Sequence, residues 1–183
     1  MSYQYYPDSL YFISYKTFNA LDFFKSDSNK QILKEQFYKA SDKFDFNIIA
    51  YAIMSNHYHL LVEIKNGKDS QNHAIKLING GSSFRIEKPA HTEKVWGSNN
   101  KHSIAILDDD AIFMVLGYIV GNPLRHGMVK DFDELDNYQY CNYKEVKKQY
   151  NKELIDNLIL KSSSLNFESI DSYEHLYKSI QGL

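Results

Sequence analysis

The stretch IIAYAIMSNHYHLLVEI, residues 48–64, decides the fold. Its β-branched, aromatic and aliphatic residues flank a short polar turn, which predicts a strand, a tight turn and a second strand. Successive side chains of a strand point to opposite faces. His57 and His59 therefore share one face, about 7 Å apart along the strand, and Tyr58 faces the opposite layer.

Periodicity and capping signals predict further elements on both sides of this hairpin, whose strands we place at 46–54 and 57–65. They are a strand at 10–18, a helix from a cap at Asp27 or Ser28 to Lys43, a helix at 71–87 interrupted by Gly80-Gly81, an irregular stretch at 89–100 and a strand at 101–107. The order is β-α-β-β-α-β.

A further helix follows the fourth strand. Residues 108–110 are three aspartates, which provide an N-cap and negative charge for its first turn. Pro123 should end it near Gly121 or Asn122. After an acidic stretch at 131–136, residues 152–160 and 170–180 have helical spacing. We therefore predict an α+β fold, a ferredoxin-like β-α-β-β-α-β sandwich with helices on one face of an antiparallel sheet. The helix after the fourth strand, which contains Tyr118, and a C-terminal helical tail follow it.

Composition sets the broad class. The chain of 183 residues is 43% hydrophobic, enough for one domain with a real core and an appended tail. No apolar run approaches the ~20 residues that cross a bilayer, and no secretory signal is visible. Cys141 is the only cysteine, which excludes an intramolecular disulfide and a multi-thiolate metal site. We expect no membrane association and a cytoplasmic location.

Charge is distributed unevenly along the chain. The net charge of −2 argues against a broadly basic surface for nucleic acid. Residues 65–101, however, hold seven Lys/Arg and three Asp/Glu, and the rest of the chain holds 14 and 20. This basic segment is either a nucleic-acid contact or simply an exposed, lysine-rich loop and helix.

The histidine pair has two interpretations. His57 and His59 are either partly buried, hydrogen-bonded residues or ligands of one metal ion. A histidine-triad nucleotide hydrolase needs a third histidine where Leu61 stands. Zinc usually takes three or four N or S ligands, so an open Mg²⁺ or Mn²⁺ site that also binds water and a phosphate oxygen fits better.

A second cluster is Tyr118-Ile-Val-Gly-Asn-Pro-Leu-Arg-His-Gly-Met-Val129. Tyr118 and Asn122 are four residues apart and share a helix face. The phenol is a possible nucleophile, and the amide oxygen a possible third metal ligand. The alternative is that Tyr118 packs in the core and Asn122-Pro123 is an ordinary helix stop.

The two clusters together resemble a known family. Met54-Ser-Asn-His-Tyr-His-Leu-Leu-Val62 and the block from Tyr118 to Val129 are similar to the two signatures of single-tyrosine HUH transposases (IS200-like), most closely the REP-associated tyrosine transposases. Trp96 and the downstream Cys141-Asn-Tyr143 add to a resemblance that spans about residues 8–145. It implies a catalytic domain at 1–145 and a helical extension at 146–183 packed on it.

The resemblance also implies roles. His57, His59 and Asn122 would bind the Mg²⁺ or Mn²⁺, and Tyr118 would be the nucleophile. Tyr118 would attack single-stranded or hairpin DNA, leaving a 5′-phosphotyrosine and a free 3′-hydroxyl that later rejoins strands. The DNA-bound protein would be nucleoid-associated.

Candidate DNA contacts come mainly from the basic segment. The cations would neutralise phosphates, and Phe84 or Trp96 would stack on a base. The residues are Arg85, Lys88, Lys94, Trp96, Lys101 and Arg125.

Several features depart from the family pattern. Ser55 replaces a proline and His126 an alanine, and the chain has only two arginines, whereas the family is generally arginine-rich. A catalytically inactive or domesticated nucleic-acid-binding module with the same fold is therefore the competing hypothesis. The C-terminal extension favours a monomer, with a homodimer as the alternative.

Overall fold

The computed structural model describes residues 9–65, 68–90, 92–165 and 173–181. A four-stranded antiparallel sheet has the order β2-β3-β1-β4. Its strands are β1 (Leu10–Thr17), β2 (Phe46–Ile53), β3 (His57–Ile64) and β4 (Trp96–Ile106). The β2-β3 hairpin places β3 beside β1, and β4 pairs with the other edge of β1. This is the predicted ferredoxin-like topology, and the α+β fold is confirmed.

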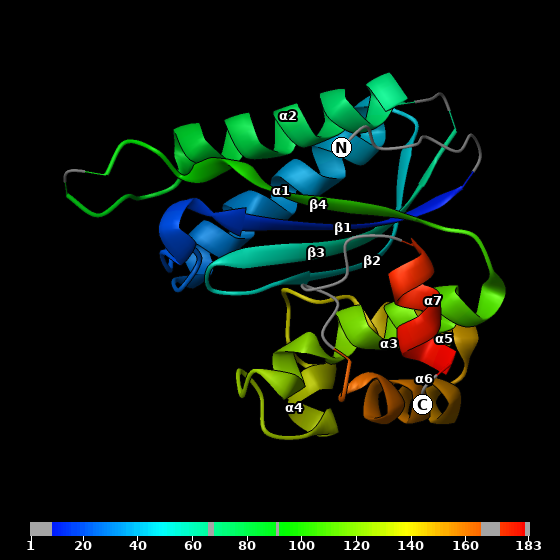
Figure 1. The fold of residues 1–183 in the computed structure, drawn as a ribbon. Coiled ribbons are helices and arrows are strands. Elements are labelled where there is room, and N and C mark those ends of the chain that lie inside the picture. The colour runs from blue at the N-terminus through cyan, green and yellow to red at the C-terminus, as the bar shows by residue number, and fades with distance from the viewer. Residues whose placement is uncertain (1–8, 66–67, 91, 166–172, 182–183) are drawn as a thin grey trace.

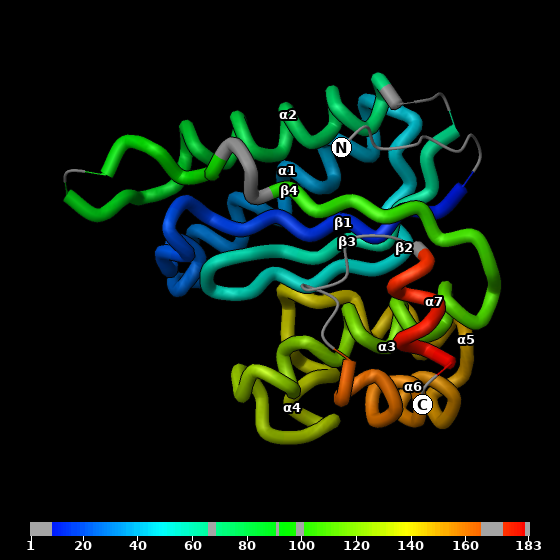
Figure 2. The backbone as a smooth tube through the Cα atoms, in the orientation of Figure 1, coloured from blue at the N-terminus to red at the C-terminus, as the bar shows by residue number. Residues whose placement is uncertain are grey.

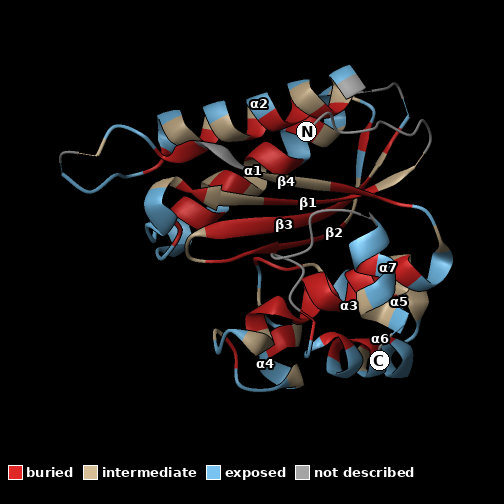
Figure 3. Ribbon diagram, in the orientation of Figure 1, coloured by how far each residue is buried: buried red, intermediate tan, exposed pale blue. Residues whose placement is uncertain are grey.

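Helices cover both faces of the sheet (Figure 1). One face carries α1 (Asp27–Lys43) and α2 (Lys68–Arg85). The remaining helices lie on the other face: α3 (Asp109–Arg125), α4 (Phe132–Asp136), α5 (Tyr143–Tyr150), α6 (Lys152–Ser162) and α7 (Tyr173–Gln181). As a result β3 is buried along nearly its whole length (Figure 3). The expectation of helices on one face is correct for α1 and α2, but the later helices form a second layer.

The first layer differs from the prediction in detail. The side chain of Ser26 caps α1 by accepting from the backbone N–H of Asn29, so the predicted caps one or two residues later are wrong. Helix α2 continues through both glycines instead of stopping at them. A Cβ on Gly81 would meet the end of the Gln36 side chain, so α2 and α1 pack closely at this glycine.

The second layer is built around α3. Asp108 caps it as predicted, by accepting from the N–H of Ala111. The predicted end at Pro123 is wrong, because the helix includes this proline although it costs one helical hydrogen bond. The N–H of His126 still donates to the carbonyl of Asn122, so helix α3 continues to Arg125.

The other elements of the second layer extend the prediction. Strand β4 begins before residue 101, and α4 and α5 were not predicted. Helix α6 confirms the predicted segment at 152–160, whereas the start of the predicted helix at 170–180 falls partly outside the described residues. None of the helices within the described ranges is both long and apolar enough to span a bilayer.

Candidate active site

The first residues of β3 and the last turns of α3 meet on one face of the sheet. As predicted, His57 and His59 share this face, and their ring centroids are 4.7 Å apart. The Tyr118 ring lies 5.5 Å from the His59 ring, centroid to centroid. The structure therefore brings together, within one chain, Tyr118 and two histidines that precede it by 61 and 59 residues in the sequence.

His59 is fully buried, and neither of its ring nitrogens has a hydrogen-bond partner. Burial holds its pKa well below the usual value, and the positive charges of His57, Arg125, His126 and Lys16 lower it further. The imidazole is therefore neutral near pH 7 and has a lone pair available, which is the form that binds a metal ion.

The neighbouring turn fixes the orientation of His57. The Asn56 amide nitrogen donates to the carbonyl of Ala20, which directs its oxygen toward His57. That oxygen lies 2.7 Å from His57 Nδ1 and can only accept, so Nδ1 carries the hydrogen. The tautomer leaves the lone pair on Nε2, as in a metal-ligating histidine held by an outer partner.

Asn122, one helical turn after Tyr118, is the candidate third ligand. It is fully buried, and its amide nitrogen donates to the Tyr118 carbonyl one turn back at 3.0 Å. Its Oδ1 has no hydrogen-bond partner. Within the described residues no three His, Cys, Asp or Glu side chains gather as a metal group, so a site here requires this amide. The candidate donor set is two imidazoles and one amide oxygen, which leaves coordination positions for water or a phosphate oxygen.

Tyr118 is enclosed by side chains and is only 2% exposed. Phe12 packs edge-on against it at 6.1 Å between ring centroids. The Arg125 guanidinium lies 4.0 Å above the ring and also donates to the Ser162 carbonyl at the end of α6. The guanidinium thus links the tyrosine to the C-terminal helices.

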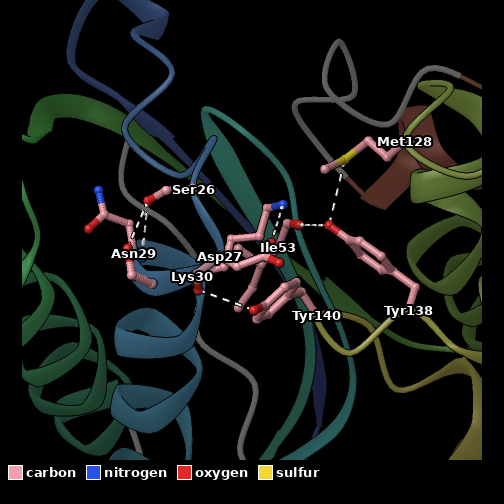
Figure 4. A network of polar contacts seen from close by, with 9 residues as sticks. Ser26, Asp27, Asn29, Lys30, Ile53, Met128, Tyr138 and Tyr140 are labelled. Atoms are coloured by element: carbon pink, nitrogen blue, oxygen red, sulfur yellow. Dashed lines mark hydrogen bonds and ion pairs between the residues drawn. The ribbon is translucent and has the colours of Figure 1, made fainter.

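A polar network ties the loop after α3 to the β2-β3 turn (Figure 4). The Tyr138 hydroxyl donates to the Ile53 carbonyl at 3.2 Å and lies 3.8 Å from the Met128 sulfur. The neighbouring Tyr140 donates to the Asp27 carbonyl, and Lys30 lies 5.1 Å above the Tyr140 ring. These contacts join α1, the end of β2 and the chain beyond α3, and so hold the two halves of the site in register.

Three of the predicted DNA contacts lie at the end of the sheet where β3 begins. Residues 87–90 and 92–94 project beyond that end (Figure 2). Lys88 is exposed on this projection, and Lys94 lies 5.1 Å above the Phe18 ring. Arg85, at the end of α2, is paired with Glu35 at 2.7 Å but remains 39% exposed.

The remaining predicted contacts are placed differently. Trp96 is buried in the first-layer core, where it stacks on Phe24 and donates to the Asn79 carbonyl. Lys101 donates to Gln71 of α2. Phe84 is 90% exposed and therefore presents the aromatic surface that buried Trp96 does not.

Sequence reasoning missed two residues beside the histidines. Asn56 belongs to the quoted motif, and its position next to His57 was the available signal. Lys16 lies opposite His57 in the β1-β3 register, and only the strand pairing reveals it.

Comparisons with known proteins agree with this architecture. A REP-associated tyrosine transposase, solved bound to a REP hairpin, is similar with a TM-score of 0.64 and 17% identity over 79% of this chain and 84% of that one. At this identity the similarity concerns the fold alone. A candidate transposase from Deinococcus radiodurans R1 gives a TM-score of 0.43, with 16% identity over 65% of this chain and 94% of that one, from which nothing is concluded. No curated protein matches.

The sequence also matches a family model, described as "Transposase IS200 like", over residues 19–120. That span includes both histidines of the site and Tyr118, and stops just before Asn122. It covers more than half of the chain, and the protein therefore belongs to the IS200-like transposase family, whose members are DNA-cleaving enzymes.

Proposed function

We propose that the protein cleaves and rejoins single-stranded DNA in a divalent-metal-dependent reaction through a 5′-phosphotyrosine. One observation carries the proposal. Tyr118 packs against His59, whose buried nitrogens, like the buried oxygen of Asn122, have no hydrogen-bond partner. Burial of unpaired polar atoms is costly, and a bound cation would satisfy them.

His57, His59 and Asn122 would hold the ion, with Mg²⁺ or Mn²⁺ as the candidates. When bound, the ion supplies positive charge that polarises the phosphodiester. Asn56 keeps His57 in the ligating tautomer, and the Tyr118 carbonyl keeps the Asn122 amide oriented. These outer contacts preorganise the ligands before DNA arrives.

Tyr118 performs the covalent step. Its Oη attacks the phosphorus and loses its proton, and the bond from phosphorus to the 3′-oxygen of the upstream strand breaks. That oxygen takes up a proton and becomes a 3′-hydroxyl, while the 5′-phosphate stays on Tyr118. A 3′-hydroxyl then attacks the phosphotyrosine, restoring a phosphodiester and the phenol, and the strand is rejoined without ATP. Arg125, whose guanidinium lies over the ring in the absence of DNA, would supply positive charge to the phosphate during the attack.

DNA would approach from the end of the sheet where the projection and β3 lie together. Arg85, Lys88 and Lys94 would neutralise phosphates there, and Phe84 would stack on a base. Lys101 would contribute from farther along β4. Because Tyr118 is buried, we propose that the scissile phosphate draws Arg125 away from the ring and pairs with it. A hairpin substrate is favoured because the structurally similar REP-associated transposase was solved on one.

The whole protein would act as a self-contained monomer. We retain the division into a catalytic domain at 1–145 and an extension at 146–183, with α5 spanning the boundary. Helix α6 packs on α3 and contacts Arg125, which supports a site completed within one chain. We further propose a cytoplasmic location with nucleoid association on DNA.

The test is a covalent-adduct assay. The protein is incubated with Mn²⁺ and a single-stranded DNA library in which a hairpin stem is flanked by randomised bases. We expect a protein–DNA adduct that survives denaturing electrophoresis and is lost with EDTA or in Tyr118→Phe. Tyr150→Phe, which removes a hydroxyl on α5 away from the site, is the matched control and should form the adduct.

The competing function is a catalytically inactive nucleic-acid-binding module. It predicts DNA binding without adduct across all hairpins, with both Mn²⁺ and Mg²⁺. An adduct of equal yield in Tyr118→Phe would likewise contradict the proposed mechanism.

A further inference from the structure

A cavity of about 310 Å³ lies beside His57, and neither His59 nor Tyr118 lines it. The turn between β2 and β3 bounds it on one side and the end of α3 on the other. This volume is at the low end for ligand pockets and suits a single nucleotide rather than a duplex. Its lining includes Lys16, Ser55, Asn56, His57, His126 and Met128.

Positive and hydrogen-bonding groups dominate this cavity. Lys16 pairs with His57 across β1 and β3, so the two side chains share a face. The exposed ring of His126 lies 5.8 Å from the His57 ring. None of the described residues that line the cavity is an aspartate or glutamate. The site is therefore suited to a phosphate group despite the chain's net charge of −2.

The order of the side chains assigns a direction to this cavity. Tyr118 contacts His59, His59 contacts His57, and His57 contacts His126. The nucleophile therefore contacts His59, whereas the cavity is lined by His57 and His126 and by neither His59 nor Tyr118. In-line displacement at phosphorus places the attacking and leaving oxygens on opposite sides.

We propose that this cavity binds the last nucleotide of the upstream strand, the one that leaves with a 3′-hydroxyl, and that Lys16 and His126 hold its phosphate. The proposal rests on the proposed function. Its value to the reaction is clear, because the downstream strand stays covalently attached to Tyr118 after cleavage whereas the upstream strand does not. Retention of the upstream 3′-hydroxyl would keep it in position to reverse or complete strand transfer.

The experiment follows both fragments after cleavage. A hairpin DNA that forms the adduct is labelled at its 5′ end, and the protein is trapped on a filter after reaction with Mn²⁺. The retained label reports the upstream fragment, and denaturing electrophoresis reports the adduct. A chase into metal-containing buffer then measures rejoining.

We expect Lys16→Ala and His126→Ala to lower upstream-fragment retention and rejoining by about tenfold, the effect of losing one charge-assisted hydrogen bond. Adduct yield should fall by much less. His126→Ala is the leading variant, because an exposed side chain can be removed without unfolding the protein. Lys16→Arg, which keeps the charge, should restore retention.

Matched controls remove a lysine and a histidine from the opposite layer. Lys39→Ala on α1 and His73→Ala on α2, both exposed, should retain the fragment as the wild type does. If adduct forms and both cavity variants retain the upstream fragment fully, the cavity assignment is wrong while the proposed function stands. If the wild type forms no adduct, both fail together.

Discussion

At the scale of single residues, the orientation of His57 depends on the amide of Asn56. We expect Asn56→Ala to lower Mn²⁺ affinity by about 10- to 100-fold, the usual effect of losing an outer partner of a ligating histidine. Electron paramagnetic resonance of free Mn²⁺ measures this directly. Asn47→Ala, which removes an exposed contact to Glu63 on the same sheet, is the control and should bind normally. Equal Mn²⁺ affinities in the two variants would show that Asn56 does not support the metal site.

His59 makes the stability of the metal-free protein depend on pH. Its pKa is lowered in the folded state from an ordinary value of 6.5, chiefly by burial. Above pH 6.5 the residue is neutral in both states and this contribution to stability is fully present. As the pH falls below 6.5, the unfolded chain takes up a proton that the folded chain does not, so the free energy of unfolding falls, by up to about 1.4 kcal/mol per pH unit.

Urea unfolding in EDTA between pH 8 and 5 tests this expectation. His59→Leu should show a shallower loss of stability on acidification than the wild type. His73→Leu, at an exposed position, serves as the comparison and should keep the wild-type slope. Parallel curves for wild type and His59→Leu would show that His59 does not contribute.

At the scale of elements, the packing of α3 on α6 depends on two glycines. A Cβ at Gly117 would lie 2.7 Å from the Leu158 backbone carbon, and one at Gly121 would lie 2.7 Å from the Ile159 side chain. We expect Gly117→Ala to destabilise the protein by about 1–3 kcal/mol, because α6 must move away. The adduct yield should fall as well, since Tyr118 is the next residue.

Gly80→Ala is the matched substitution in α2, where nothing lies within 4 Å of the added methyl group. It should be neutral or stabilising by up to about 1 kcal/mol, because alanine favours a helix over glycine. Thermal unfolding compares the two variants. A Gly117→Ala protein as stable as Gly80→Ala would show that α6 can move away from α3 without loss of stability.

Most elements were predictable from local patterns, and the errors have physical causes. The first three strands and α1 follow from periodicity, whereas β4 begins at Trp96, before its predicted start, and Gly80-Gly81 and Pro123 were treated as breaks. At Gly81 the Gln36 side chain of α1 packs close to α2, and past Pro123 the helical hydrogen bond from His126 to Asn122 continues α3. Trp96 was a candidate for stacking on a DNA base because sequence does not report burial. Its indole lies in the core.

At the scale of the whole molecule, sequence predicted that His57, His59 and Tyr118 lie together, but not what surrounds them. The histidine face and the Tyr118–Asn122 spacing follow from helix and strand geometry. The second helical layer does not, because an amphipathic helix shows which of its sides is buried but not which face of the sheet it covers. The cavity beside His57 likewise forms from three segments that are distant in sequence, Lys16, the β2-β3 turn and His126.

The whole-molecule arrangement also predicts that each chain works alone. Tyr118 lies against His59 of its own chain, and α6 holds Arg125 over the tyrosine. A site shared between subunits would instead be restored by mixing two defective chains. We therefore expect Tyr118→Phe mixed with His59→Ala to form no more DNA adduct than either variant alone. Light scattering during size-exclusion chromatography should give the monomer mass of 21.4 kDa.

Wild type mixed with His59→Ala is the control for this experiment and should form adduct in proportion to its wild-type content. A gain of adduct in the mixture of the two defective variants would mean that α3 exchanges between chains. The α3–α6 contact decides between these outcomes, because exchange of α3 between chains requires either that α3 separates from α6 or that both helices move to the other chain together. Gly117→Ala, which loosens that contact, should therefore be the background in which complementation first becomes detectable.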